Sequence, residues 1–80
     1  MEVTIKLFAN LREKAPECAR NGQWVMEIGG QDRVVDILQK YDLVLATDKM
    51  LVTVNGQVLK ENYQLQEGDE ICVFPPLIGG

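Results

Sequence analysis

Apolar and polar residues alternate strictly in two distant parts of this chain. Residues 3–8 carry aliphatic side chains at every second position, and Glu70–Phe74 repeats the pattern near the other end. Residues 23–28 place Trp24, Met26 and Ile28 on one face. A period of two is typical of a strand with one buried face. The pattern therefore predicts three strands, and the short β-branched run Leu51–Val54 predicts a fourth.

One segment has the helical period instead. Spacings of three and four residues separate its apolar positions, which are Val34, Ile37, Leu38, Tyr41 and Leu45. Asp32 is the predicted N-cap, because its carboxylate can accept hydrogen bonds from the first-turn N–H groups. We expect this helix to end near Asp42 and residues 43–46 to continue as an apolar connection.

Glycine-containing turns separate these elements. Asn21-Gly22 precedes the second strand, and Asn55-Gly56 is the strongest hairpin signal, because this dipeptide tolerates the positive φ angles of a type I′ turn. Val58 and Leu59 are expected to begin the return strand, and residues 67–69 predict a tight turn before the last strand. Ala9–Lys14 is compatible with one helical turn.

The predicted order is strand, strand, helix, strand, short strand, strand. A single amphipathic helix covers only one face of a sheet, which indicates a two-layer α+β domain. The first and last strands can pair in parallel only through a long crossover, and the helix supplies one. We therefore expect a β-grasp (ubiquitin-like) fold in residues 1–74: a mixed sheet of four to five strands covered on one face by one main helix.

Charge and length exclude several functions. The 80 residues suffice for one domain, and the formal net charge is −4. Nucleic-acid binding and docking on an anionic membrane both need clustered basic residues, which the sequence lacks. The N-terminal residues lack the features of a secretory signal, and no apolar run approaches the ~20 residues of a membrane span. We expect a cytoplasmic protein whose partners carry basic rims.

The composition offers little catalytic chemistry. The chain has two cysteines and no histidine, which cannot form the usual four-ligand zinc site. We expect both cysteines to be reduced thiols, with Cys18 in an exposed loop and Cys72 buried as a small apolar residue. No glycine-rich phosphate loop is present, so ATP is not expected to bind to this chain alone. No metal or cofactor site is predicted.

The C-terminal residues carry the main functional prediction. Pro75 and Pro76 cannot donate ladder hydrogen bonds, so pairing ends after Phe74 and residues 75–80 should project as an extended arm. Six residues can reach ~20 Å. Leu77 and Ile78 make this arm apolar, as a contact surface would be, whereas Gly79 and Gly80 lack a Cβ and can enter a narrow slot. The candidate reactive group is the carboxylate of Gly80. Phe74 is expected to pack on the domain rather than act only as an anchor for a partner.

The chain resembles the small, sulfur-carrying subunit of molybdopterin synthase in three stretches: residues 3–13, Leu51 to Gly56 and, most specifically, residues 67–80. The resemblance implies that an adenylating enzyme of the ubiquitin-activating type, using ATP and magnesium, activates Gly80. A persulfide enzyme or sulfide would then convert it to a thiocarboxylate. It also implies that residues 74–79 enter a large catalytic subunit, where the sulfur builds the dithiolene of a molybdenum or tungsten cofactor. The chain itself would not be catalytic.

Three alternatives remain open from the sequence. Sulfur carriers of thiazole biosynthesis share the predicted fold and the Gly-Gly end, and the small-subunit family usually has a smaller residue where this chain has Ile78. The chain could therefore carry sulfur to thiazole, cysteine or a specialised metabolite. A ubiquitin-like modifier that joins Gly80 to lysines is the second alternative, and a β-grasp interaction domain with an inert tail is the third.

Overall fold

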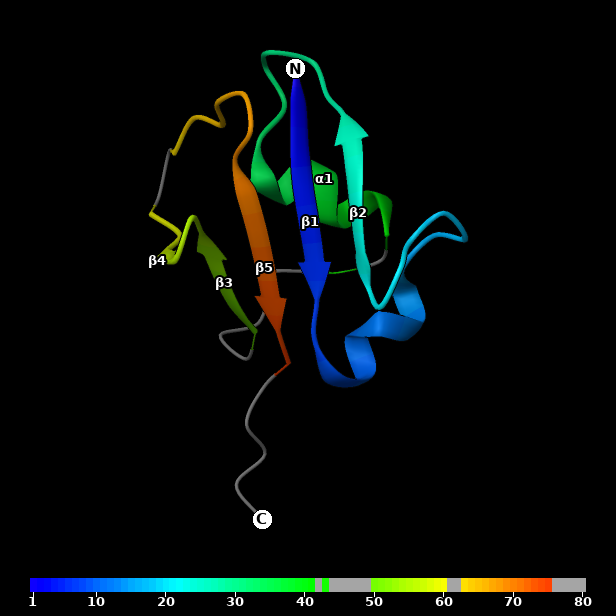
Figure 1. Ribbon diagram of the computed structural model, residues 1–80. Coiled ribbons are helices and arrows are strands. Elements are labelled where there is room, and N and C mark those ends of the chain that lie inside the picture. The colour runs from blue at the N-terminus through cyan, green and yellow to red at the C-terminus, as the bar shows by residue number, and fades with distance from the viewer. Residues whose placement is uncertain (42, 44–49, 61–62, 76–80) are drawn as a thin grey trace.

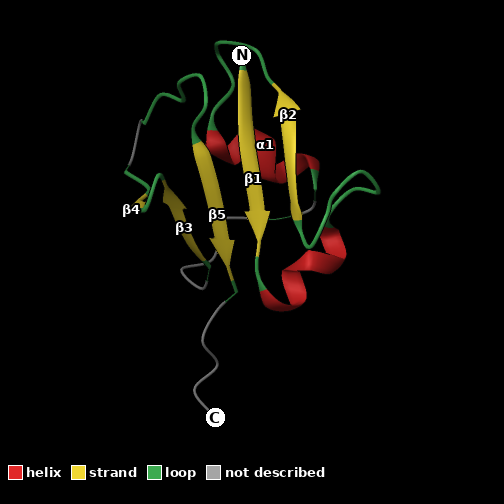
Figure 2. Cartoon of the chain, viewed as in Figure 1, coloured by secondary structure: helices red, strands yellow, loops and turns green. Residues whose placement is uncertain are grey.

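The computed structural model contains a five-stranded sheet with one α-helix packed across one face (Figures 1 and 2). It describes residues 1–41, 43, 50–60 and 63–75. The helices in these ranges are the 3₁₀ helix η1 (Ala9–Lys14) and α1 (Val34–Lys40). The strands are β1 (Glu2–Leu7), β2 (Gln23–Glu27), β3 (Leu51–Val54), β4 (Gln57–Val58) and β5 (Glu70–Phe74).

The sheet has the order β2-β1-β5-β3-β4. Its central pair, β1 and β5, is parallel, with Ile5 opposite Ile71 and Leu7 opposite Val73, and every other pairing is antiparallel. The arrows of β1 and β5 lie side by side and point the same way in Figure 1. This mixed sheet with a single helix across it confirms the predicted β-grasp architecture.

The core lies between the sheet and α1. The strands contribute their alternating aliphatic residues, and α1 contributes Val34, Ile37 and Leu38, which are almost fully buried. Trp24 is buried and meets the Tyr41 ring edge-on, with 5.0 Å between ring centroids. Trp24 is therefore a core residue, as its place on the apolar face of the strand predicted, and the partly buried Tyr41 packs against the core. No helix in the described part of the chain has the length and apolar character needed to cross a bilayer.

The predicted start of the helix was wrong by one residue. Arg33 occupies the N-cap position in an extended conformation, and its backbone N–H donates to the Asp36 carboxylate at 3.0 Å. The Asp32 carboxylate instead accepts from the backbone N–H of Gly29 at 3.0 Å and closes the preceding loop. The helix ends at Lys40. Asp42 and Leu45, which the sequence placed at and beyond its end, lie outside the described residues.

Both Asn-Gly pairs form turns as predicted, and both have a left-handed backbone, which was predicted for Asn55-Gly56. Asn21 and Gly22 have φ angles of 55° and 78°, and Asn55 and Gly56 have 53° and 84°. The return strand β4 begins one residue before the predicted Val58, and the Leu59 backbone N–H then donates to Val52 at 2.9 Å. β2 ends one residue before the predicted limit, although Ile28 still donates to the Met1 carbonyl at 2.8 Å.

The two turn glycines give a matched test of packing against strain. A Cβ on Gly22 would lie 2.6 Å from the Leu7 carbonyl oxygen, whereas a Cβ on Gly56 would meet nothing within 4 Å. Gly56→Ala should lower the free energy of unfolding by about 1–2 kcal/mol through backbone strain alone. Gly22→Ala should cost about 2–4 kcal/mol, because strain and a backbone clash add. Urea denaturation measures both, and equal losses would contradict the clash at Gly22.

Candidate functional site

The predicted site begins where β5 ends. Phe74 is the last residue of β5, and the half-buried Pro75 follows it as the first residue of the predicted arm. The remaining predicted site residues, Pro76, Leu77, Ile78, Gly79 and Gly80, lie outside the described residues, and their roles stay predictions. The described part of the site is therefore the root of the arm and the sheet face around it.

An aromatic stack holds this root. The Phe74 ring lies on the Phe8 ring with 4.4 Å between centroids and an interplanar angle of 16°. The Phe8 backbone N–H donates to the Val73 carbonyl at 3.1 Å and so continues the pairing of β1 with β5 past the last residue of β1. The prediction that Phe74 packs on the domain is confirmed. The partner Phe8 was missed, although its even position after β1 placed it on the open face, the sheet face that turns away from α1.

A third apolar residue extends the stack on the open face. Leu51 of β3 is the register partner of Phe74, and it is 47% exposed. Phe8, Phe74 and Leu51 thus come from three segments and form what we call the apolar strip, which borders the first residue of the arm. Apart from Cys72, charged and polar residues occupy the rest of the open face on β1 and β5, namely Glu2, Thr4, Lys6 and Glu70. The apolar strip lies beside the first residue of the arm and is therefore suited to contact a protein that also binds the arm.

Cys72 lies next to the strip and is half-buried, so the prediction that it is a buried apolar residue was wrong. Its even position in β5 directs it to the open face, which α1 does not cover. The Sγ lies 3.9 Å from the Glu70 carboxylate, which also pairs with the Lys6 ammonium at 3.3 Å. This ion pair is solvent-accessible and contributes at most about 1 kcal/mol. Cys18 is exposed as predicted, and both cysteines are free thiols.

A buried carboxylate fixes the opposite end of β5. Asp69 is 5% exposed, and its oxygens accept from the Asn55 amide, the Tyr63 hydroxyl and the Gln66 backbone N–H, each at 2.8 Å. Burial alone would raise the pKa of Asp69, but these three hydrogen bonds stabilise the carboxylate and bring the pKa below its usual value. The hydrogen bond to Asp69 raises the pKa of the Tyr63 hydroxyl, with burial and the negative charge acting in the same direction.

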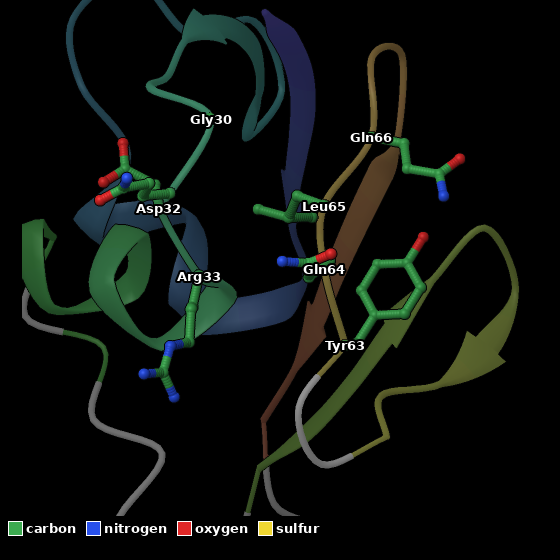
Figure 3. A pocket seen from close by; sticks show the side chains of 8 residues that line it. Gly30, Asp32, Arg33, Tyr63, Gln64, Leu65 and Gln66 are labelled. Carbon is green, nitrogen blue, oxygen red and sulfur yellow. The ribbon is translucent and has the colours of Figure 1, made fainter.

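A cavity lies at this same end of the fold, away from Pro75. It measures about 650 Å³ and is lined by residues 30–33 and 63–66, two segments that face each other in Figure 3. Its acidic and phenolic groups already have partners within the fold, because Asp32 accepts from Gly29 and Tyr63 donates to Asp69. The described residues contain no cluster that could hold a metal ion.

The sequence matches the model of the ThiS family over residues 5–80. A relative from Drosophila yakuba, named as a molybdopterin synthase sulfur carrier subunit, is 29% identical, and the alignment covers 100% of this chain and 92% of the relative. Its name describes the same kind of protein that the C-terminal motif resembles.

Solved structures show the same fold. Small archaeal modifier protein 1 of Haloferax volcanii has a TM-score of 0.73 and 26% identity, covering 95% of this chain and 98% of that one. A chain in the complex of subunits 1 and 2 of the molybdopterin-converting factor from Helicobacter pylori has a TM-score of 0.65, with all of both chains covered. At 20% identity, this second likeness establishes the fold alone.

The buried carboxylate at Asp69 predicts an acid-sensitive fold. Because its pKa is lowered in the folded state, its contribution to stability is present above the unfolded value of 3.8 and is lost as the pH falls through the folded value. Asp69→Asn should therefore cost about 2–3 kcal/mol at neutral pH and reduce the further loss on acidification. Urea denaturation at neutral pH and below pH 3.8 measures both effects. The control Glu2→Gln alters an exposed carboxylate and should keep the wild-type profile; an unchanged profile in Asp69→Asn would contradict the assignment.

Proposed function

This chain belongs to the ThiS family, and we propose that it is a sulfur carrier whose C-terminal Gly80 carboxylate is the reactive group. The thiocarboxylate formed there would supply sulfur for molybdopterin, the function named for the Drosophila relative. The observation that carries the proposal is the extent of the family match, which runs through the core strands and continues to Gly80. The protein would act in the cytoplasm and would not be a catalyst by itself.

The chemistry follows from the weakness of a carboxylate as an electrophile. Attack of the Gly80 carboxylate on the α-phosphorus of ATP would release pyrophosphate and form an acyl adenylate. Sulfide would then displace AMP and leave a thiocarboxylate. The persulfide of a donor enzyme would instead form an acyl disulfide, and a second thiol would release the thiocarboxylate by forming a disulfide with the donor cysteine. ATP and magnesium would bind to the activating enzyme. The thiocarboxylate would attack a pterin precursor inside a large catalytic subunit.

The apolar strip supports a docking role beside the arm. Each partner must hold the domain while the terminal residues enter its active site, and a rigid apolar contact next to the arm does this at low entropic cost. Phe8 and Phe74 fix each other by stacking, and Leu51 adds exposed apolar area. The net charge of −4 favours partners with basic residues around the docking site. We propose the activating enzyme and the large subunit as these partners.

A modifier function is the second candidate. It is favoured by the 26% identity with small archaeal modifier protein 1, which covers nearly all of both chains. In this case the Gly80 adenylate would pass to lysine amines and form isopeptide bonds. The same activation step serves both functions, so they differ only in the nucleophile that the activated Gly80 meets. Sulfur delivery to thiazole or to another metabolite also remains open.

Sulfur loading gives the first test. After incubation with an activating enzyme, ATP, magnesium and a sulfide or persulfide donor, the intact protein should gain the mass of one sulfur in place of one oxygen. Deletion of Gly80 should abolish this change and leave the melting temperature unaltered, because glycine has no side chain to bury in a core. Absence of both adenylate and thiocarboxylate in the wild type would refute the carrier and the modifier together. Lysine-linked adducts would select the modifier.

The apolar strip gives a second test with a control on the same sheet face. Leu51→Asp places a charge beside Phe74 and should lower kcat/KM for adenylation at least about tenfold. Its effect on stability should stay below about 1 kcal/mol, because Leu51 is 47% exposed. Val25→Asp introduces the same charge at a 57% exposed valine on edge strand β2, and it should leave kcat/KM unchanged. Equal losses in both variants would contradict a docking role for the strip.

A further inference from the structure

An alanine with a left-handed backbone lies directly beside the stacked phenylalanines. Ala9 has a φ angle of 53°, next to Phe8 at the junction of β1 with η1. The other positive-φ residues in the described part of the chain are asparagines or glycines. Those residue types tolerate this region, whereas for alanine it costs on the order of 1 kcal/mol. The left-handed backbone of Ala9 is therefore unusual for its residue type.

 The residues around Ala9 must therefore impose this backbone conformation.

Hydrogen bonds on both sides of Ala9 impose this conformation. Upstream, the Phe8 backbone N–H is held by the Val73 carbonyl at 3.1 Å, which fixes Phe8 in the sheet. Downstream, the Leu11 backbone N–H donates to the Phe8 carbonyl at 3.1 Å, and the Leu11 side chain is buried. The chain must therefore leave β1 and deliver Leu11 to the core within three residues. A left-handed residue at position 9 makes this sharp change of direction.

We propose that Ala9 is a positioning residue that holds the Phe8 ring against Phe74 and so orders the root of the C-terminal arm. The Phe8 backbone cannot rotate without breaking its hydrogen bond to Val73 or moving Leu11. The Cβ of Ala9 excludes most of the other backbone conformations that position 9 could adopt. Glycine would relieve the strain but would also restore those conformations. Alanine at position 9 thus lowers stability slightly but keeps the Phe8 ring in a fixed position.

The benefit of a fixed ring rests on the proposed carrier function. Phe74 is followed by Pro75 and the arm, so a fixed Phe8–Phe74 stack restricts the direction in which the chain leaves β5. A partner that binds the apolar strip and the arm together then orders fewer groups on binding. Strain that is retained beside a binding surface is a recognised means of pre-organisation. A purely local role in the turn would affect stability without affecting docking.

The test compares Ala9→Gly with Asn21→Gly in the full chain. Both variants place glycine at an exposed position with a left-handed φ angle, 53° and 55°, but only the first adjoins the stack. Ala9→Gly should shift Tm by less than about 4 °C, because strain relief and the greater entropy of the unfolded chain oppose each other. It should weaken the NOEs between the Phe8 and Phe74 rings and speed hydrogen exchange at the Phe8 amide. The KM for the carrier in adenylation should rise about three- to tenfold with kcat unchanged.

Asn21→Gly should leave the ring NOEs, the exchange rate and KM at their wild-type values. The proposal is overturned if the two variants behave alike, or if Ala9→Gly loosens the rings without raising KM. Failure of the proposed function has a different signature, because the wild type itself would then not be adenylated. In that event the ring NOEs and the amide exchange still decide whether Ala9 holds Phe8, and unchanged values would overturn the positioning role.

Discussion

The parallel pairing of β1 with β5 is the constraint on which the rest of the structure depends. It places the first and last strands at the centre of the sheet, where their aliphatic residues are buried against α1. Parallel neighbours need a long crossover, and the segments between them supply β2, α1, β3 and β4. Because β5 is central, the residues that follow Phe74 start from one of the best-supported positions in the fold. The candidate site is thus a direct extension of the core.

Each end of β5 is fixed by a different kind of interaction. At its beginning, the buried Asp69 carboxylate joins the β3–β4 turn to the segment before β5, and the Asp69 carbonyl accepts from the Thr4 backbone N–H at 2.9 Å. At its end, the Phe8–Phe74 stack and the bond from Phe8 to Val73 continue the central pairing. A buried carboxylate with three hydrogen bonds restricts geometry strongly, because any displacement leaves a charge unpaired. The strand therefore offers a stable base for the proposed arm, which would enter another protein.

The sequence predicted the features that depend on local pattern. Alternation located β1, β2, β3 and β5, the Asn-Gly pairs located both left-handed turns, and helical spacing located α1. The misses depend on tertiary context. Asp32 and Asp36 are both acceptable near a helix start. Only the structure shows that the extended Arg33 is the N-cap and that its backbone N–H donates to Asp36. The apolar neighbours of Cys72 predict a core residue, and only the position of α1 shows that its side of the sheet is open. The stacking partner of Phe74 could be found only by aligning β1 with β5. The buried role of Asp69 was missed, because one of its three partners, Asn55, comes from the distant β3–β4 turn and no local pattern brings it to the carboxylate.

The central claim is that the sulfur-bearing atom of this protein is the carboxyl carbon of Gly80, presented from the end of β5. Fragmentation of the loaded intact protein in a mass spectrometer tests it most directly, because it assigns the added mass to a residue. The account predicts that one oxygen is replaced by sulfur in fragments that contain Gly80, while all fragments that end before it keep their unmodified mass. Sulfur added to a fragment containing Cys18 or Cys72, with an unmodified Gly80, would indicate a persulfide on a cysteine and contradict the claim.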